Sequence, residues 1–521
     1  MRINNYKPVA MRYQDNKAGD CGYAFDSVFA LTSGDTYMTS AADGLAALEA
    51  QLQQDLEYLE LPAKPWVPAH TVDNQPVRDV VVIGAGMCGL AATARLQLAG
   101  ITNSITYDTA PAGQEGPWVT FARMETLRSP KSLQGPALGL ASLTFRAWYT
   151  AQWGKAAWQA LDKIPKEMWM NYLVWYRQVL NLPVQNGVRV TAIEPAGSLI
   201  ALTLEGAAPA RVYSRRLVLA TGRSGLGGVA VPLFLQGVDR RFWAHSADNI
   251  DFSALQGKRV AVIGAGASSM DNAATALEQG AARVDLLIRR KAMPRINKMT
   301  GIGSQGVVHG MHQLPDRWKW KFVDYTAATQ TPPPRASTLR VSRHENARFL
   351  LNCAINAVRP EADELVIETT QGPLRYDYLI AATGFSNDFS GRSEFAAIAP
   401  HIRRWADGRY QPAMGPARQN MLEAPDLGPG FEFRERVPGA CPMLSHIHCF
   451  NDAAMLTHGK VSGDIPAVSA GADRLVRAIA ASLFAEDVEQ HYASLQAYDT
   501  PELQGDEWVD ATPLLNQENA L

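Results

Sequence analysis

Three absences in the sequence limit what this protein is. Five cysteines among 521 residues, none in C-x-x-C spacing, make neither a disulfide framework nor a zinc site, and free thiols fit a reducing compartment. Lys and Arg total 49 against 51 Asp and Glu, so the basic excess of nucleic-acid-binding proteins is missing. No stretch approaches the roughly 18 apolar residues of a membrane span, and the N-terminus has no signal-peptide core. These absences predict a soluble, cytoplasmic protein.

Length and composition indicate a globular protein with more than one domain. A chain of 521 residues exceeds what one hydrophobic core usually fills. Hydrophobic residues make up 47% and charged residues 19% of the chain, a balance that excludes wholesale disorder.

One sequence pattern occurs twice, and its first copy begins with the β-branched run at residues 78–83, which is typical of a buried parallel strand. A glycine-rich loop follows, and then an Ala/Leu-rich stretch that is typical of a helix ending near Gly100. Strand, G-x-G-x-x-G and helix in this order are the context of a dinucleotide-binding site, with the phosphates at the positive end of the helix. The loop consists of Gly84, Ala85, Gly86, Met87, Cys88 and Gly89.

Each glycine of this first loop has its own physical role. Gly84 permits the tight turn, Gly86 lets a pyrophosphate approach the backbone, and Gly89 allows the helix to pack closely on the strand. The next strand ends at Asp108, 24 residues after Gly84, where a carboxylate accepts hydrogen bonds from ribose hydroxyls. We predict that this copy binds FAD.

The second copy repeats the order of the first but differs in charge. Its loop ends in Ser269, a small residue in place of the third glycine, and its second strand ends at Arg289 and Arg290. Guanidinium groups bind a 2′-phosphate through charge-assisted hydrogen bonds. Each is worth about 1.5–3 kcal/mol, so two distinguish NADPH from NADH by more than tenfold. We predict that this copy binds NADPH, although a solvated strand end is the alternative for the arginines. The loop is Gly264, Ala265, Gly266, Ala267, Ser268 and Ser269.

A third G-x-G-x-x-G stands at residues 301–306. It follows no apolar strand, so the pattern is accidental by this criterion and the segment is predicted to be a loop.

Two further segments each end a β-rich stretch in a small-residue turn, at residues 217–222 (LVLATG) and 378–385 (YLIAATGF). With them, the order G-x-G-x-x-G, ATG, G-x-G-x-S-S with trailing arginines, and ATGF resembles the class B flavin-dependent monooxygenases. These include flavin-containing monooxygenases, Baeyer–Villiger monooxygenases and N-hydroxylases. The resemblance covers roughly residues 78–484.

The resemblance implies an α/β fold with two Rossmann-like dinucleotide-binding domains. An FAD-binding domain would be formed by residues 76–225 and 377–521, and an NADPH-binding domain, residues 226–376, would be inserted between them. Residues 1–75 would be an N-terminal extension. Ligands of such sheets lie at the carboxyl ends of the parallel strands.

The resemblance also implies contacts with the flavin. Trp118, in the sequence Gly-Pro-Trp, stands where the family often has Gly-Gly-x-Trp beside the flavin. Residues 127–131 (LRSPK) are similar to the segment that lines the flavin ring. Asp464, in Gly-Asp-Ile-Pro before a helical run to Leu483, is similar to the C-terminal element that contacts the ribityl chain.

Four basic residues are considered for catalysis, and three of them are selected. Baeyer–Villiger enzymes have an F-x-G-x-x-x-H motif, of which only the histidine is present here, as His245. A histidine of the linker that hydrogen-bonds to the backbone is an equal alternative to a functional role. Those enzymes also place an arginine before the second ATG segment, where a permanent cation stabilises an anionic peroxide. Here the region offers Arg335, Arg340 and Arg343. We select Arg340 and Arg335, and surface or NADP contacts are the alternative.

The implied function is NADPH- and O2-dependent oxygenation of a small organic molecule through a flavin C4a-(hydro)peroxide. Whether oxygen enters at carbon, nitrogen or sulfur stays open. A disulfide reductase is disfavoured because no cysteine pair is spaced for thiol exchange. An FAD-dependent NADPH:acceptor reductase without oxygen insertion and a non-catalytic nucleotide sensor are the alternatives.

Three other segments have a readable pattern. Residues 143–180 are dense in aromatics at helical spacing, which favours core packing over a substrate pocket. Residues 292–334 are long enough for a mobile lid. Residues 41–59 place five leucines on one helical stripe. Docking of this helix onto the FAD domain is favoured, and formation of a homodimer is the alternative.

Overall fold

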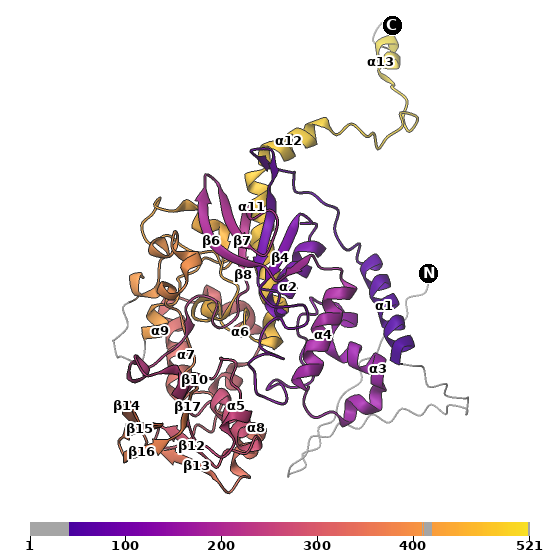
Figure 1. Cartoon of the computed structure of the whole chain (residues 1–521). Coiled ribbons are helices and arrows are strands. Elements are labelled where there is room, and N and C mark those ends of the chain that lie inside the picture. The colour runs from indigo at the N-terminus through magenta and orange to yellow at the C-terminus, as the bar shows by residue number, and fades with distance from the viewer. Residues whose placement is uncertain (1–40, 409, 411–418, 519–521) are drawn as a thin grey trace, which may run out of the picture. The chain divides into compact units, whose positions relative to one another are not determined.

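The computed structural model describes residues 41–408, 410 and 419–518 (Figure 1). It has the predicted α/β fold, with two separate, mainly parallel sheets. Among the described helices, none has the length and apolar character that crossing a bilayer requires. Residues 1–40 of the expected N-terminal extension lie outside the described residues.

The first sheet has the strand order β5-β4-β3-β8-β7-β6, and β19 pairs with β8. Its centre is parallel, whereas β6 and β7 form an antiparallel extension. This agrees with the predicted strands on both sides of the first glycine loop. The strands are β3 (Arg78–Ile83), β4 (Ser104–Asp108), β5 (Val184–Asn186), β6 (Arg189–Ala196), β7 (Leu199–Glu205), β8 (Arg211–Leu219) and β19 (Ile447–His448).

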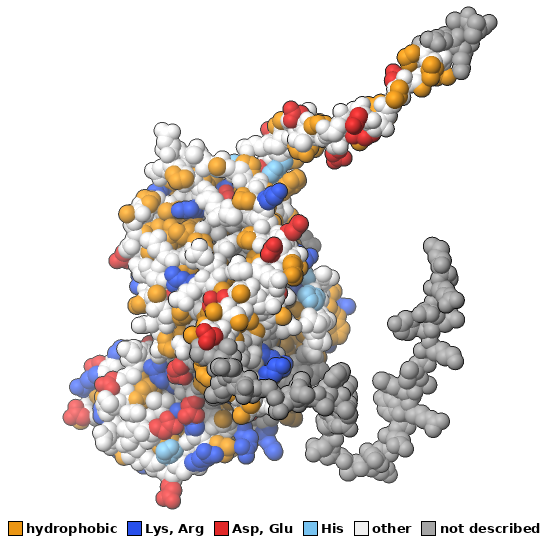
Figure 2. All heavy atoms as spheres, turned by 90° about the vertical axis from the view of Figure 1, so that its right-hand side faces the viewer, with side chains coloured by type: hydrophobic (Ala, Val, Ile, Leu, Met, Phe, Trp, Pro, Cys, Tyr) orange, Lys and Arg blue, Asp and Glu red, His pale blue; other side chains and the backbone are white. Residues whose placement is uncertain are grey.

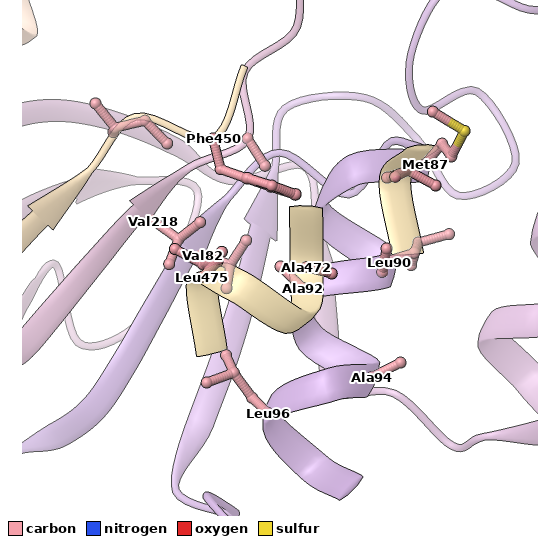
Figure 3. Close-up of a cluster of buried hydrophobic side chains, with 14 of the residues drawn as sticks. Val82, Met87, Leu90, Ala92, Ala94, Leu96, Val218, Phe450, Ala472 and Leu475 are labelled. Carbon is pink, nitrogen blue, oxygen red and sulfur yellow. The ribbon is translucent and has the colours of Figure 1, made fainter. Parts of the chain in front are cut away.

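Two helices from distant parts of the chain pack together on this sheet. α2 (Met87–Leu98) connects β3 to β4, and α11 (Val468–Glu486) is the helical run predicted after Asp464. Figure 3 shows Ala472 and Leu475 of α11 beside Ala92 of α2 and Val82 of the sheet, and all four are fully buried. Small side chains let the two helices approach, so α11 completes the core around the first sheet. This sheet and the helices that cover it are called the first lobe below.

The second sheet is wholly parallel, in the order β10-β17-β11-β12-β13. Successive residues of β11 point to opposite faces. Val260 and Val262 pack with α5, whereas Ala261 packs against the antiparallel strands β14–β16. The sheet is therefore covered on both sides, as a parallel sheet requires. This sheet, the helices α5 and α8 and the separate antiparallel sheet β14–β16 are called the second lobe below. The elements are β10 (Trp243–His245), β11 (Arg259–Ile263), α5 (Ala267–Glu278), β12 (Arg283–Ile288), α8 (Arg335–Ser342), β13 (Ala347–Leu351), β14 (Ile355–Glu361), β15 (Glu364–Thr369), β16 (Gly372–Tyr376) and β17 (Tyr378–Ala381).

The chain passes between the two sheets through two paired segments. β9 (Gly228–Val229) pairs antiparallel with β18 (Phe385–Ser386). β18 follows the second ATG turn directly, and β9 begins six residues after the end of the first. β17 lies in the second sheet although it follows residue 376, so the expected boundary there precedes the last strand of the sheet. The domain limits themselves stay a proposal.

The aromatic segment forms a core, as predicted. α3 (Phe145–Ala160) and α4 (Lys166–Val179) bury most of its rings, including Trp169, Tyr172 and Tyr176. The hydroxyls of Tyr172 and Tyr176 donate to backbone carbonyls, which satisfies their polar ends. None of these rings lines the cavity described below.

The leucine-rich helix α1 (Ala41–Tyr58) packs on α3 (Figure 1), which confirms the predicted docking. Leu52 and Leu56 are buried there, and the indole N–H of Trp175 donates to Glu49. A homodimer stays an untested alternative.

The predicted lid contains short helical elements rather than an open loop. A 3₁₀ turn (Lys298–Ile302), α6 (Gln305–Gly310) and α7 (Asp316–Thr329) occupy it. The prediction of a loop at residues 301–306 is therefore wrong in conformation, because Ser304 caps α6 by accepting from the N–H of Val307. No strand precedes the motif, so its exclusion as a nucleotide loop stands.

The C-terminal region continues past α11 into α12 (Val488–Ala497) and α13 (Thr512–Glu518). Figure 2 shows hydrophobic side chains exposed along this segment. They include Val488, Tyr492, Leu495, Tyr498, Trp508 and Val509.

Candidate functional site

A cavity of about 1790 Å³ lies between the two sheets, at the carboxyl ends of their parallel strands. Pockets for one small ligand usually measure about 300–1,000 Å³, so this cavity has room for more than one. Both glycine loops and both ATG turns line it, together with residues from 107–130, 297–311, 391–395 and 459–467.

The first glycine loop has the geometry that its sequence predicts. Gly84 has φ +100°, and a Cβ there would lie 2.5 Å from the carbonyl oxygen of Ala220. A Cβ on Gly89 would lie 1.7 Å from the carbonyl oxygen of Gly84, so helix and strand do pack as closely as expected. Gly86 faces the cavity, and the nearest chain atom to its hypothetical Cβ is 3.8 Å away.

Both helices that follow the glycine loops begin without a side-chain cap. Gly86 is the N-cap of α2 and Gly266 that of α5, and neither has a side chain that could accept from the N–H groups of the first turn. The free N–H groups of these turns therefore face a cavity at the positive end of each helix dipole. This is the arrangement that binds phosphate groups, and the loops fit two dinucleotides.

Asp108 lines the cavity beside the first loop. Its carboxylate accepts hydrogen bonds of 2.7 Å from the N–H groups of Ala85 and Ala110, one on each oxygen. Burial raises the pKa of Asp108, and the two N–H donors oppose that rise. Each oxygen keeps a free lone pair, so the predicted contact with a ribose is compatible with this geometry.

The predicted flavin contacts all belong to the wall of the cavity. Trp118, Arg128 and Asp464 all line it. The indole Nε1 of Trp118 is buried and has no hydrogen-bond partner among the described residues. Its ring packs edge-on against Trp169, with the centroids 6.2 Å apart. A donor left in this state is available to a bound ligand.

The second glycine loop accommodates its serine. Ser269 is fully buried, and its hydroxyl donates to the carbonyl oxygen of Gly266 at 2.8 Å. Gly264 has φ +122°, and its hypothetical Cβ would lie 3.4 Å from the Cβ of Ser269, an ordinary contact. Gly266 has no chain atom within 4 Å of a hypothetical Cβ, and it lines the cavity with Ser268 and Ser269.

Two polar residues of α5 were missed in the sequence. Asp271 and Asn272 line the cavity, are at most 6% exposed, and each has a buried Oδ1 without a hydrogen-bond partner among the described residues. Buried acceptors without a partner are able to accept a hydrogen bond from a ligand. Their signal was a polar pair one turn after the glycine loop, on a helix that is otherwise rich in alanine.

The arginines that follow β12 lie outside the cavity lining. Arg289 is exposed, and Arg290 is half-buried and donates to the carbonyl oxygen of Ala328 at 3.0 Å. They stand at the strand end that the 2′-phosphate prediction requires, and that prediction stays untested.

His245 is fully buried in β10, and its Nδ1 accepts from the N–H of Ala247 at 3.1 Å. Its Nε2 is buried with no partner among the described residues. Burial lowers the pKa of His245, which favours the neutral ring. The ring packs edge-on against Phe385 at 5.8 Å, next to the paired linkers, and does not itself line the cavity. This geometry agrees with the alternative of a linker histidine that hydrogen-bonds to the backbone. A catalytic role of His245 stays a prediction.

The two selected arginines do not line the cavity either. Arg335 is exposed at the start of α8, and Arg340 forms a two-pronged ion pair with Glu278 at 2.9 and 2.6 Å. Their role as the peroxide-stabilising cation stays a prediction. Sequence reasoning did not select as cations the arginines that line the cavity, which are Arg123, Arg128, Arg189, Arg223 and Arg392.

The four described cysteines are free thiols. Cys88 lines the cavity, and burial raises its pKa to about 12. Its thiol donates to the carbonyl oxygen of Ser462 at 3.3 Å. A thiol so far from ionising is a poor nucleophile, which agrees with the argument against disulfide exchange.

Comparison with known proteins extends these observations. The family model described as pyridine nucleotide-disulphide oxidoreductase matches residues 81–301. An FAD-dependent urate hydroxylase of Xanthomonas campestris pv. campestris is 39% identical over 469 residues, which cover 90% of this chain and 99% of the relative.

Solved structures share the fold at low identity. L-lysine 6-monooxygenase from Pseudomonas syringae has a TM-score of 0.60 and 17% identity, over 78% of this chain and 99% of that one. Ornithine hydroxylase from Pseudomonas aeruginosa has a TM-score of 0.59 and 14% identity, over 77% and 98%.

Proposed function

The chain belongs to the class B flavin-dependent monooxygenases, in the family of the FAD-dependent urate hydroxylase, and we propose that its substrate is urate or a closely similar oxidised purine. It is an FAD-dependent monooxygenase that uses NADPH and O2 to oxygenate a small organic molecule. Oxygen insertion is favoured over the reductase alternative because the relative is a hydroxylase. The observation that carries the substrate proposal is the 39% identity over nearly the full length of that relative.

The chemistry of the cavity supports such a substrate. Urate is planar, is an anion near neutral pH, and has N–H groups and carbonyl oxygens around its edge. Arg128 lines the cavity with a permanent positive charge. The side chains of Asn297, Thr300 and Gln305 line the same cavity and offer donors and acceptors. A charged, flat ligand with polar edges fits this lining better than an aliphatic ketone does.

The residues of both lobes fit their cofactors. The loop of Gly84 and Gly86, with Asp108 and Trp118, would hold FAD, and the loop of Gly264 to Ser269 would hold NADPH. FAD supplies oxygen-activating and hydride-accepting chemistry when it is bound, and NADPH supplies the hydride. The chain's own residues bind, orient and exclude water around this chemistry.

Individual side chains contribute in distinct ways. Arg128 orients an anionic substrate and attracts developing negative charge, because arginine stays ionised even though burial lowers its pKa. Asp271 and Asn272 accept hydrogen bonds from the ligand of the second loop, because their buried Oδ1 atoms make no hydrogen bond among the described residues. Arg340 lies 3.9 Å from the same atom of Asp271. Trp118 closes the cavity wall and keeps one indole N–H for the ligand.

The test is a coupled activity measurement on the purified holoenzyme. Urate should accelerate NADPH oxidation, and mass spectrometry should detect a product that is heavier by one oxygen atom. Xanthine is the matched control, because it has the same ring system and lacks the C8 carbonyl. Cyclic ketones test Baeyer–Villiger insertion in the same assay. If urate leaves NADPH oxidation unchanged, or only raises peroxide release, the substrate proposal is wrong.

Two further proposals concern the setting of the enzyme. We place it in the cytoplasm, since its four described cysteines are free thiols. A homodimer is the second proposal, for which the exposed apolar residues of α12 offer a surface.

A further inference from the structure

Arg340 lies where the two nucleotide lobes meet. It belongs to α8 of the second lobe, and its side chain is only 13% exposed. Within its own lobe its guanidinium donates two hydrogen bonds to the carboxylate of Glu278 in α5 and lies 3.9 Å from the carboxylate of Asp271. Across the gap it donates to the carbonyl oxygen of Arg123 at 3.1 Å and lies 3.6 Å from the carboxylate of Glu125.

Arg123 makes the reverse crossing from the first lobe. Its guanidinium donates to the carbonyl oxygen of Asp248 at 3.4 Å and stacks over the ring of Phe252 at 5.4 Å. Both of these residues belong to the second lobe, just after β10. Each lobe therefore extends one arginine to the backbone of the other, and the two contacts share Arg123.

This pair of arginines is joined to the cavity. Arg123 and Asp271 both line it, and Asp271 lies beside Arg340 on the other side. The connections between the lobes at β9 and β18 are short paired strands that follow Gly222 and Gly384, both at positive φ with no chain atom near a hypothetical Cβ. Linkers of this kind accept rotation, so contacts outside them fix the lobe spacing. The packing of Trp320 on Trp405 is one such contact, and the two arginines make another at α8.

From these contacts we infer that Arg340 and Arg123 form a latch that holds the two nucleotide lobes at the spacing required for hydride transfer. Arg340 is then a positioning residue of the reductive step and not the cation that contacts oxygen. The inference rests on the proposed use of NADPH and FAD in these two lobes. Misplacement by about 1 Å costs a reaction of this kind on the order of a hundredfold in rate.

The test compares Arg340→Ala with Lys258→Ala. Lys258 is exposed at the amino end of β11, away from the carboxyl ends that form the cavity, so its loss controls for one missing charge. Flavin reduction by NADPH is followed anaerobically, without substrate, by stopped-flow absorbance. Arg340→Ala should reduce at least tenfold more slowly at saturating NADPH, with unchanged product formed per NADPH consumed. Arg340→Lys should be intermediate, because lysine lacks the forked geometry.

Hydrogen–deuterium exchange tests the latch without any turnover. Residues 121–126 and helix α8 belong to different lobes, and both should exchange faster in Arg340→Ala, while Lys258→Ala resembles the parent. This exchange measurement needs no substrate, so it tests the latch even if the proposed substrate is wrong. Glu125→Gln is the second variant, for use if Arg340→Ala does not fold, because it changes only a largely exposed partner of Arg340. It should also make α8 exchange faster, by less than Arg340→Ala would.

The outcomes separate positioning from catalysis. Slower reduction with faster exchange in both segments supports the latch. Normal reduction overturns it, and the loss of product with normal reduction would assign Arg340 to the oxygen-transferring step instead. If only Glu125→Gln folds, unchanged exchange in α8 overturns the latch.

Discussion

Two glycines of the same loop should fail in opposite ways when each is replaced by alanine. Gly86 has φ −66° and ψ −179°, which alanine adopts without strain, and the nearest chain atom to a Cβ there is 3.8 Å away. The stability of Gly86→Ala without cofactor should therefore stay within about 1 kcal/mol of the parent. Its FAD affinity should fall at least tenfold, or about 1.4 kcal/mol, because the methyl group occupies the approach of the pyrophosphate.

Gly89→Ala should instead destabilise the fold. Its Cβ would lie 1.7 Å from the carbonyl oxygen of Gly84, whereas real contacts below 3.0 Å essentially never occur. Helix α2 would have to move away from β3 by more than about 1 Å, which a close-packed core resists. Alanine gains about 1 kcal/mol of helix propensity over glycine, but overpacking costs about 1–3 kcal/mol or more, so the net effect is a loss.

The assay is thermal unfolding with and without added FAD, together with FAD titration by flavin fluorescence quenching. Gly310→Ala is the matched control, because Gly310 has φ −96°, no chain atom within 4 Å of a Cβ, and no place in the cavity lining. The reasoning is refuted if Gly86→Ala binds FAD as tightly as the control does. It is equally refuted if Gly89→Ala unfolds at the parent's temperature.

Three other outcomes are expected. Replacing Arg289 and Arg290 together by alanine should raise the KM for NADPH at least tenfold and leave the KM for NADH unchanged, since each charge-assisted bond is worth about 1.5–3 kcal/mol; equal effects on both coenzymes would contradict the 2′-phosphate assignment. Burial raises the pKa of Asp79 to about 6, so its carboxyl group binds a proton more tightly in the folded state than in the unfolded chain. The free energy of unfolding should therefore increase as the pH falls from about 7 to 5, on the order of 1–3 kcal/mol. Asp79→Asn should remove that gain in pH-dependent unfolding, and an unchanged profile would exclude Asp79 as its source. Cys88 should resist thiolate-directed reagents at about pH 8 in the native protein, because its raised pKa leaves almost no thiolate; modification at the rate of the unfolded chain would disprove this.

Much of the fold follows from local sequence patterns. The two strand–loop–helix units were predictable because a glycine that must adopt positive φ, as Gly84 does, and a run of β-branched residues before it act over a few residues. The aromatic spacing that ends in Tyr176 identified a buried helix for the same reason. The family resemblance rested on the order of such local motifs along the chain.

The roles of the charged side chains were decided only by the tertiary structure. Arg340 meets Arg123, 217 residues away, and Glu278, 62 residues away, and no local pattern encodes a contact that depends on how two lobes pack. Asp271 and Asn272 each keep a buried Oδ1 without a hydrogen bond among the described residues because α5 turns that side toward the cavity. A charged residue binds whichever partner or ligand the fold brings within about 4 Å. The sequence therefore determines the charge and hydrogen-bonding groups of a side chain, and the packing of distant elements determines which partner it binds.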